Sequence, residues 1–259
     1  MTNEILPVEQ IAAAARAEVD LLLGVVESTD PGAAVPMCPG WTVTDMATHL
    51  GGVFRWVNVV ISEARAQPPV GDERRALFSD PDPADAAGVV KRLREASTAI
   101  LDSLEQAPAD LACWTIWPAP GTPLEFWQRR MLHETLVHRV DAENARAGAP
   151  DPGSALGTAV AADGVDEMML GFAGRYAATL RAEQTFTLAV EALDAERAWW
   201  TRIGPEAPEF GRGATTADAV VRGRAGELLL LLWNRRDAAG LDLTGRQDAL
   251  EIWRTGAHL

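Results

Sequence analysis

Three of the four histidines in the chain lie in two short segments with helical character, and this concentration is its clearest sign of chemistry. His49 belongs to WTVTDMATHLGG, whereas His133 and His138 belong to RRMLHETLVHRVDAENA, which also contains Glu134. Two imidazole nitrogens and one carboxylate on neighbouring helices are typical of a metal site that keeps a fourth coordination position open. The sequence therefore predicts a metal centre formed by His49, Glu134 and His138.

Helical spacing identifies the partner of His138. Residues four apart on a helix project from one face, so Glu134 and His138 can share an ion. His133 and His138 are five positions apart and point about 140° away from each other. The spacing differs from the HExxH motif of zinc proteases, because the second histidine comes one position later. Zinc suits the ligand set, and nickel or iron would also be compatible with it.

The metal interpretation has an alternative, because spacing alone more often marks surface or core residues than ligands. A histidine ligand usually needs an acceptor for its second ring nitrogen, and the reachable ones are Asp45 for His49 and Asp141 for His138. A purely structural site would need a fourth protein ligand. His133, Asp141 and Cys38 are the candidates for that position.

Four long amphipathic helices are predicted to position these residues. Apolar side chains recur at helical spacing over residues 8–27, 42–66, 83–106 and 122–146. The second and fourth helices begin with capping boxes at Thr42 and Thr122. The economical architecture is a four-helix bundle, and a further helix is expected over residues 154–179.

After about residue 182 the pattern changes to the alternation expected of strands. Strands are predicted at 185–190, 198–203 and 217–223, followed by a buried helix at 225–236, a short strand at 241–245 and a helix at 246–254. We therefore expect a helical bundle over residues 1–181 and a small α+β domain over residues 182–259.

Composition limits the partners. A hydrophobic content of 47% and a charged content of 23% are those of a soluble globular protein. The net charge of −14 argues against nucleic acid or an anionic membrane as partner. No apolar run approaches the ~20 residues of a membrane span. The two cysteines form no CxxC pair, and the acidic N-terminus resembles no secretory signal, so a cytoplasmic location is expected.

Four segments resemble the mycothiol-dependent maleylpyruvate isomerase family: CPGWTVTDMATHLGG (38–52), HETLVHRVDAENA (133–145), AADGVDEMM (161–169) and ADAVVRGRAGELLLLLWNRR (217–236). The family combines a DinB-like four-helix bundle with a C-terminal domain related to sterol-carrier-like α+β folds. The resemblance implies that zinc is held by His49, Glu134 and His138. It also implies that mycothiol is the thiol cosubstrate, so neither Cys38 nor Cys113 need be the nucleophile.

The chemistry implied by the resemblance is addition of a metal-activated thiolate to an electrophilic carbon. In isomerisation the thiolate adds to a cis double bond, rotation follows, and elimination leaves the trans isomer. Two alternatives stay open: a mycothiol S-transferase or tailoring enzyme for another electrophile, and a non-catalytic small-ligand or lipid-binding protein with a structural metal. A monomer or a homodimer fits either case.

Arginines are the candidates for holding the carboxylates of an acidic substrate. Arg55 and Arg139 lie closest in sequence to the predicted ligands, and Arg222, Arg235 and Arg236 belong to the C-terminal motifs. Surface or helix-capping roles are the alternative for each. Pocket walls or core packing are the two expectations for the tryptophans Trp41, Trp56, Trp114, Trp117 and Trp127. Asp163, Asp166 and Glu167 are assigned to capping or the domain junction.

Overall fold

The structure is a computed structural model that describes residues 6–80, 82, 84–149, 153, 155–176 and 178–257. The chain divides into two compact units, one over residues 7–150 and one that includes residues 151–259. This division precedes the boundary expected near residue 182, because the helix that begins at Thr158 packs against a helix of the C-terminal part. The expected helix ends at residues 83 and 154 lie outside the described residues.

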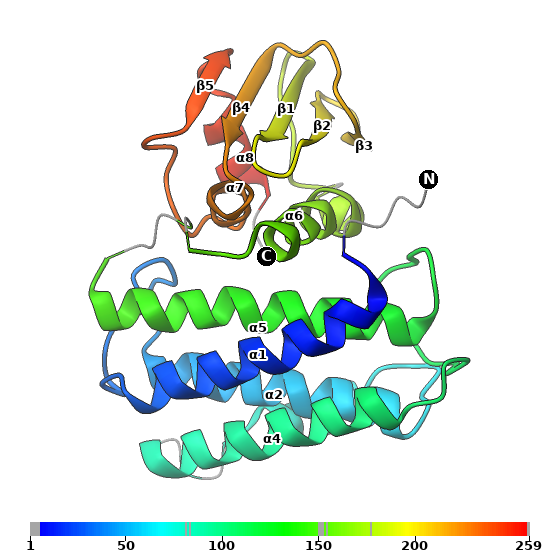
Figure 1. Cartoon of the computed structure of the whole chain (residues 1–259), viewed down its shortest axis with the longest axis vertical. Helices are drawn as coiled ribbons and strands as arrows, with labels where there is room; N and C mark the ends of the chain where they lie inside the picture. The colour runs from blue at the N-terminus through cyan, green and yellow to red at the C-terminus, as the bar shows by residue number, and fades with distance from the viewer. Residues whose placement is uncertain are drawn as a thin grey trace. The chain divides into compact units, whose positions relative to one another are not determined.

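The N-terminal unit is built on four long helices that lie side by side (Figure 1). They are α1 (Val8–Glu27), α2 (Val43–Ser62), α4 (Ala86–Gln106) and α5 (Pro123–Ala147). Helix α1 packs mainly against α5, and α2 packs mainly against α4, with further contacts between α2 and α5. The predicted four-helix architecture is confirmed.

Local capping fixes where the two ligand-bearing helices begin. The Thr42 side chain accepts a hydrogen bond from the Asp45 amide, and the Asp45 carboxylate accepts one from the Thr42 amide. Thr122 and Glu125 form the same box at the start of α5, with Pro123 as the first helical residue. Helix α5 ends at Gly148, whose φ of +69° is the left-handed conformation that favours glycine.

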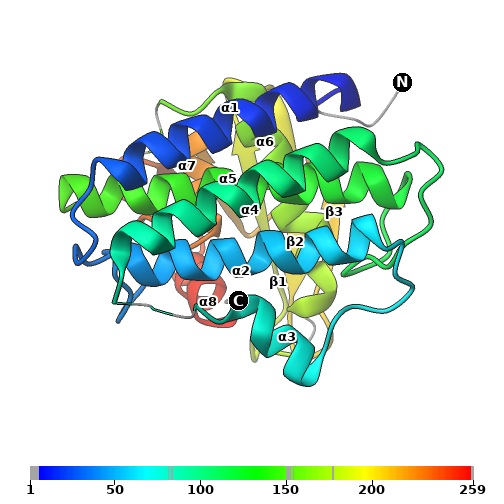
Figure 2. The ribbon, with the colours of Figure 1, turned by 90° about the horizontal axis from the view of Figure 1, so that it is seen from below.

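A short helix, α3 (Gly71–Phe78), was not predicted from the sequence. It has no buried residue, so its sequence lacks the apolar face by which helices are recognised. It lies beside α2 and outside the four long helices (Figure 2). The contact is close at Gly52, where a Cβ atom would lie only 2.6 Å from Cδ1 of Phe78.

The core of the bundle consists of aliphatic and aromatic side chains from all four helices. Phe54 and Leu50 of α2, Leu93 and Ile100 of α4, and Trp127 of α5 are almost fully buried. Trp127 contacts the rings of Trp56 and Trp114, and the Trp127 indole nitrogen donates to the Trp114 carbonyl at 2.9 Å. Packing therefore accounts for Trp56, Trp114 and Trp127, whereas Trp41 contacts the rings of His49 and His138.

The C-terminal unit contains a five-stranded sheet with the strand order β3-β2-β1-β4-β5. The strands are β1 (Phe186–Ala192), β2 (Arg197–Ile203), β3 (Glu209–Arg212), β4 (Ala219–Gly223) and β5 (Asp242–Gly245). In this sheet the central strand β1 pairs with β4 in parallel, and the other neighbouring strands pair antiparallel. Helices α7 (Ala225–Leu232) and α8 (Ala249–Gly256) complete the α+β unit, as predicted. Strand β3 was not predicted from the sequence.

The segment before the sheet is shorter and less regular than the single helix expected over residues 154–179. Helix α6 (Thr158–Asp166) is followed by a π-helical turn, η1 (Glu167–Gly171), and a 3₁₀ turn, η2 (Phe172–Arg175). Residues 154 and 177 lie outside the described part of the chain. Within the described residues, no helix is both long enough and apolar enough to cross a bilayer.

Candidate metal centre

The structure brings the three predicted ligands together inside the bundle. His49 comes from α2, whereas Glu134 and His138 come from one face of α5. Oε1 of Glu134 lies 3.7 Å from Nε2 of His49 and 3.5 Å from Nε2 of His138. One ligand atom of each residue lies within 4.8 Å of the others. The predicted convergence is confirmed, while the bound ion itself stays a prediction.

Two of the three separations between these atoms are close to those of a zinc site. Zinc bonds of about 2.1 Å at tetrahedral angles place neighbouring donor atoms about 3.4 Å apart. The two separations from Oε1 of Glu134 are 3.5 and 3.7 Å, which needs little movement of either histidine. Two imidazole nitrogens and a carboxylate oxygen are also ligands that zinc accepts.

Aromatic rings surround the two histidines. The Trp41 ring lies 5.0 Å from that of His49 and is stacked at 6.4 Å on that of His138. The ring centroids of Phe78 in α3 and His49 are 6.2 Å apart. The side chain of His138 is 9% exposed, whereas that of His49 is 34% exposed. The candidate centre is therefore shielded at His138 and accessible at His49.

Of the two predicted acceptors for the second ring nitrogens, Asp141 contacts its histidine and Asp45 has another partner. Asp141 lies 3.0 Å from Nδ1 of His138 and is fully buried, as predicted. Asp45 does not support His49. Its carboxylate instead binds the Thr42 amide at 2.8 Å and the Thr42 hydroxyl at 2.6 Å, because an acid in the first helical turn serves the capping box.

Charged neighbours determine the ionisation of Glu134 and His138. Burial opposes ionisation of Glu134, but the Arg130 charge and hydrogen bonds with His138 and His49 outweigh it and hold its pKa well below the usual value. Burial also lowers the pKa of His138, but hydrogen bonds to Asp141 and Glu134 prevail and raise that pKa to about 9. A metal ion must therefore displace a proton from His138 at neutral pH.

Arg130 is a site residue that the sequence analysis missed. Its Nη2 atom lies 2.6 Å from Oε2 of Glu134, and the residue is only 2% exposed. A cation four positions before Glu134 was the available signal, since residues with this spacing face each other on a helix. The candidate arginines had been selected by their distance in sequence from the histidines instead.

Two of the three predicted catalytic arginines lie in the N-terminal unit, and each has another partner in the structure. Arg139 lies next to His138 in the chain, but its guanidinium binds Glu18 of α1 at 2.5 Å and Glu143 at 2.7 Å. Nε of Arg55 donates to the Leu77 carbonyl at 2.8 Å.

The remaining candidate arginines belong to the C-terminal unit. Arg222 of β4 pairs with Glu191 of the neighbouring strand β1 at 2.7 Å. Arg235 donates to the Trp233 carbonyl and Arg236 to the Asp237 carbonyl, just after α7. The Arg235 contact, at the residue that caps α7, agrees with the helix-capping alternative, whereas Arg236 binds a carbonyl of the following loop.

The candidates for a fourth protein ligand do not join the group of His49, Glu134 and His138. Among the described residues, the group close enough to share an ion comprises only His49, Glu134 and His138. Asp141 faces the far nitrogen of His138, and Sγ of Cys38 lies 3.7 Å from Asp141 rather than at the site. The second cysteine, Cys113, is partly buried against the core, as expected for a packing residue.

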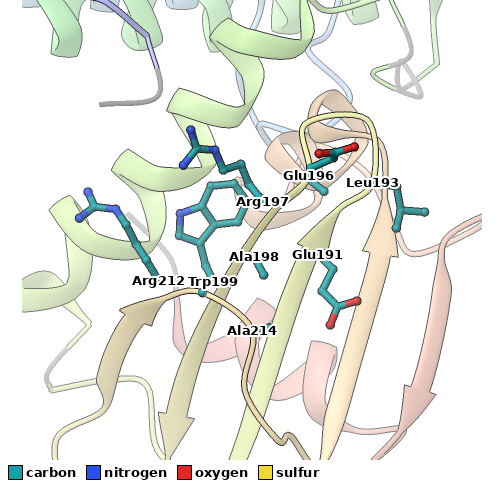
Figure 3. A pocket seen from close by; sticks show the side chains of 10 residues that line it. Glu191, Leu193, Glu196, Arg197, Ala198, Trp199, Arg212 and Ala214 are labelled. Atoms are coloured by element: carbon teal, nitrogen blue, oxygen red, sulfur yellow. The ribbon is translucent and has the colours of Figure 1, made fainter. Parts of the chain in front are cut away.

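The C-terminal unit contains a hollow of about 810 Å³ beside β2 (Figure 3). Its lining includes Glu191, Glu196, Arg197 and Arg212 together with Trp199. Arg212 and the Trp199 indole both bind Asp166, so two of the lining groups hold the unit together. The remaining lining is small or apolar and includes Leu193, Ala198 and Ala214, so the hollow combines charged and apolar surfaces.

The fold and the site together define a class of two-part protein, in which a helical bundle with a His-Glu-His group precedes a mixed α+β unit. Residues 12–143 match the family model of the mycothiol maleylpyruvate isomerase N-terminal domain, and residues 159–251 match that of the corresponding C-terminal domain. The chain therefore belongs to the mycothiol-dependent maleylpyruvate isomerase family, as the sequence motifs indicated.

Solved structures of similar fold carry the same family name. The chain resembles the crystal structure of a mycothiol-dependent maleylpyruvate isomerase with a TM-score of 0.65 at 14% identity, covering 95% of this chain and 97% of the other. A mutant form of a mycothiol-dependent maleylpyruvate isomerase, with one histidine replaced by alanine, gives a TM-score of 0.67 with the same identity and coverage. Comparison with curated protein sequences gives no match.

Proposed function

We propose that the protein is a metal-assisted, mycothiol-dependent enzyme that acts on a small electrophile, with cis–trans isomerisation of a maleylpyruvate-like substrate as its reaction. The single observation that carries the proposal is the convergence of His49, Glu134 and His138 within 4.8 Å. Membership in the family and the likeness of the fold to maleylpyruvate isomerase support it.

In this proposal the three residues hold a divalent ion, zinc in the first place and nickel as another possibility. When bound, such an ion supplies an open coordination position at which a thiol loses its proton near neutral pH. Glu134 contributes the negative charge that the cation needs, and Asp141 orients the His138 ring. Trp41 and Phe78 limit the access of water to the two imidazoles.

A catalytic ion is favoured over a structural one by the composition of the site. A structural zinc site is closed by four protein ligands, whereas a catalytic site leaves one position for water or substrate. Among the described residues, three side chains form the group, and the 34% exposure of the His49 side chain provides access from solvent. We further propose a cytoplasmic location, where low-molecular-weight thiols stay reduced.

The substrate-binding arginines stay predictions. Arg55 lies on α2 with His49 and is only half-buried, so it is the first of them to test by substitution. Arg222 of β4 already pairs with Glu191. Arg139 is less suited to this role, because Glu18 and Glu143 already occupy its guanidinium. S-transfer to another electrophile uses the same centre and is distinguished by a product that retains the thiol.

The test begins with elemental analysis of the purified protein and of two matched variants. Glu134→Gln removes a proposed ligand, whereas Glu143→Gln removes another glutamate of α5 that also pairs with an arginine four positions earlier. Metal should be lost only from Glu134→Gln. The cobalt-substituted protein is then titrated with mycothiol, and isomerisation of maleylpyruvate is assayed. The proposal would be refuted by a wild-type protein that binds no metal, or by a cobalt spectrum that does not change when mycothiol is added.

A further inference from the structure

Helix α5 contains two arginine–glutamate pairs with the same spacing but different surroundings. Arg139 and Glu143 form one pair, and Arg139 also binds Glu18 of α1. Arg130 and Glu134 form the other, and here the glutamate is also a proposed metal ligand. Arg130 lies beside the proposed metal site, and Arg139 is a buried arginine whose glutamate partners are not proposed ligands. Comparing the two separates an effect on the metal from the general effect of losing a buried arginine.

The two carboxylate oxygens of Glu134 have different partners. Oε1 faces the imidazoles, 3.7 Å from Nε2 of His49 and 3.5 Å from Nε2 of His138. Oε2 lies 2.6 Å from Nη2 of Arg130. A carboxylate can offer a metal either one oxygen or both, and here Oε1 approaches both imidazoles whereas Oε2 binds Arg130.

Arg130 is well placed to maintain this division. The Arg130 side chain is 3% exposed and that of Glu134 is 17% exposed, so solvent screens their attraction little. Moving Oε2 onto a metal ion would break a charge-assisted hydrogen bond and leave a buried guanidinium without that bond, which is unfavourable. The positive charge of Arg130 also repels a cation approaching Oε2.

All these groups lie along one stripe of α5. Arg130, Glu134, His138 and Asp141 follow one another at spacings of four, four and three residues, which is the repeat of a single helix face. Each proposed ligand on α5 is thereby held by another side chain of the same helix, Glu134 by Arg130 and His138 by Asp141. A rigid helix thus fixes both ligands and both supporting groups.

We propose that Arg130 is a positioning residue that makes Glu134 a one-oxygen ligand and thereby keeps a coordination position free for the thiol. This inference rests on the proposed function, because it requires that the trio holds a metal ion. It concerns how one carboxylate is presented, so it can fail while the metal and thiol chemistry stand.

The first test uses the wild-type protein loaded with zinc. A crystal structure of this form should show Oε1 of Glu134 bonded to the ion and Oε2 still bonded to Arg130. Both oxygens of Glu134 at bonding distance from the ion would overturn the inference, whatever the activity of the protein. This measurement does not depend on whether any variant folds.

The second test compares three variants in the cobalt form by visible absorption and by X-ray absorption at the metal edge. Arg130→Met should add an oxygen neighbour and weaken the visible bands, because the freed Oε2 joins the coordination sphere. Arg130→Lys should restore much of the wild-type spectrum, since its ammonium can still bind Oε2. Arg139→Met removes the other buried arginine of α5 and should leave the metal spectrum unchanged.

Titration with mycothiol then measures the consequence for the thiol. The near-ultraviolet band of a cobalt–thiolate bond should appear in wild type, and its midpoint should require about 10–100-fold more thiol in Arg130→Met. Wild-type coordination and thiol affinity in Arg130→Met would contradict the inference. Absence of metal binding or of the thiolate band in wild type would instead contradict the proposed function, so the two failures are distinguishable.

Discussion

The carboxylate of Asp141 accepts a hydrogen bond from Nδ1 of His138 over 3.0 Å, and both residues are buried on the same face of α5. This bond leaves Nε2 of His138 directed at Oε1 of Glu134, 3.5 Å away. A histidine that binds metal through one ring nitrogen usually has the other held by such an acceptor. Asp141 therefore fixes both the orientation of the ring and the nitrogen that faces the centre.

Asp141→Asn is expected to weaken zinc binding by about 10–100-fold, because the amide holds the imidazole less firmly and adds no negative charge. Competition with a chelating dye measures the dissociation constant. Asp45→Asn is the matched control, since the Asp45 carboxylate serves the capping box of α2 and does not support His49. Equal losses of zinc affinity in both variants would show that Asp141 has no particular role.

The metal-free protein should lose stability as the pH rises from about 6.5 to about 9. The folded state raises the pKa of His138 from 6.5 to about 9, because its bonds to Asp141 and Glu134 outweigh burial. A group whose pKa is raised on folding stabilises the protein fully below its unfolded pKa and loses that contribution as the pH passes the folded value. Urea unfolding at successive pH values measures the free energy of unfolding.

The zinc-loaded protein provides the contrast for this pH dependence. A metal ligand must be unprotonated, so His138 has no proton to lose in the loaded form and the decline should vanish. Glu134 does not interfere, because its pKa lies well below its usual value and the group stays ionised throughout this range. A metal-free protein whose stability is constant or rising between pH 6.5 and 9 would rule out the protonated His138.

Two helical glycines should respond in opposite ways to alanine. A Cβ on Gly52 would lie 2.6 Å from Cδ1 and 3.0 Å from Cα of Phe78, so α3 must move. Gly52→Ala is therefore expected to lower the free energy of unfolding by about 1–3 kcal/mol. Gly24→Ala meets nothing within 4 Å and should raise it by about 1 kcal/mol through helix propensity. Chemical denaturation compares the two, and destabilisation of both variants would show that the Phe78 contact is not the cause.

Local signals predicted the parts of the fold and site that depend on a few neighbouring residues. The capping boxes at Thr42 and Thr122, the shared face of Glu134 and His138, and the bond from His138 to Asp141 all follow from helical spacing, and the structure contains each of them. His49 can lie near Glu134 and His138 only if α2 packs against α5. A bundle of amphipathic helices predicts this packing, and the structure contains it.

Features that depend on competition between partners were not predicted. Asp45 was close enough in sequence to serve His49, but the Thr42 amide lies nearer and takes its carboxylate. Arg139 is adjacent to His138, yet the helix turns it toward Glu18 of α1. The boundary between the units also depended on tertiary contacts, because α6 has a helical pattern like that of the bundle but packs against α7.

Asp166 is expected to be a main polar support of the C-terminal unit. It is 2% exposed, binds Arg212 through two bonds of 2.6 and 2.7 Å, and accepts the Trp199 indole N–H at 2.8 Å. Asp166→Asn keeps the shape but removes the charge, and should lower the free energy of unfolding by about 2 kcal/mol, as for other charged hydrogen bonds. Glu209→Gln is the control, since Glu209 and Arg202 form an exposed pair on β3 and β2 whose loss should have little effect. Urea midpoints of the two variants provide the comparison, and a loss as large in Glu209→Gln as in Asp166→Asn would show that burial of the Asp166 pair is not what stabilises this unit.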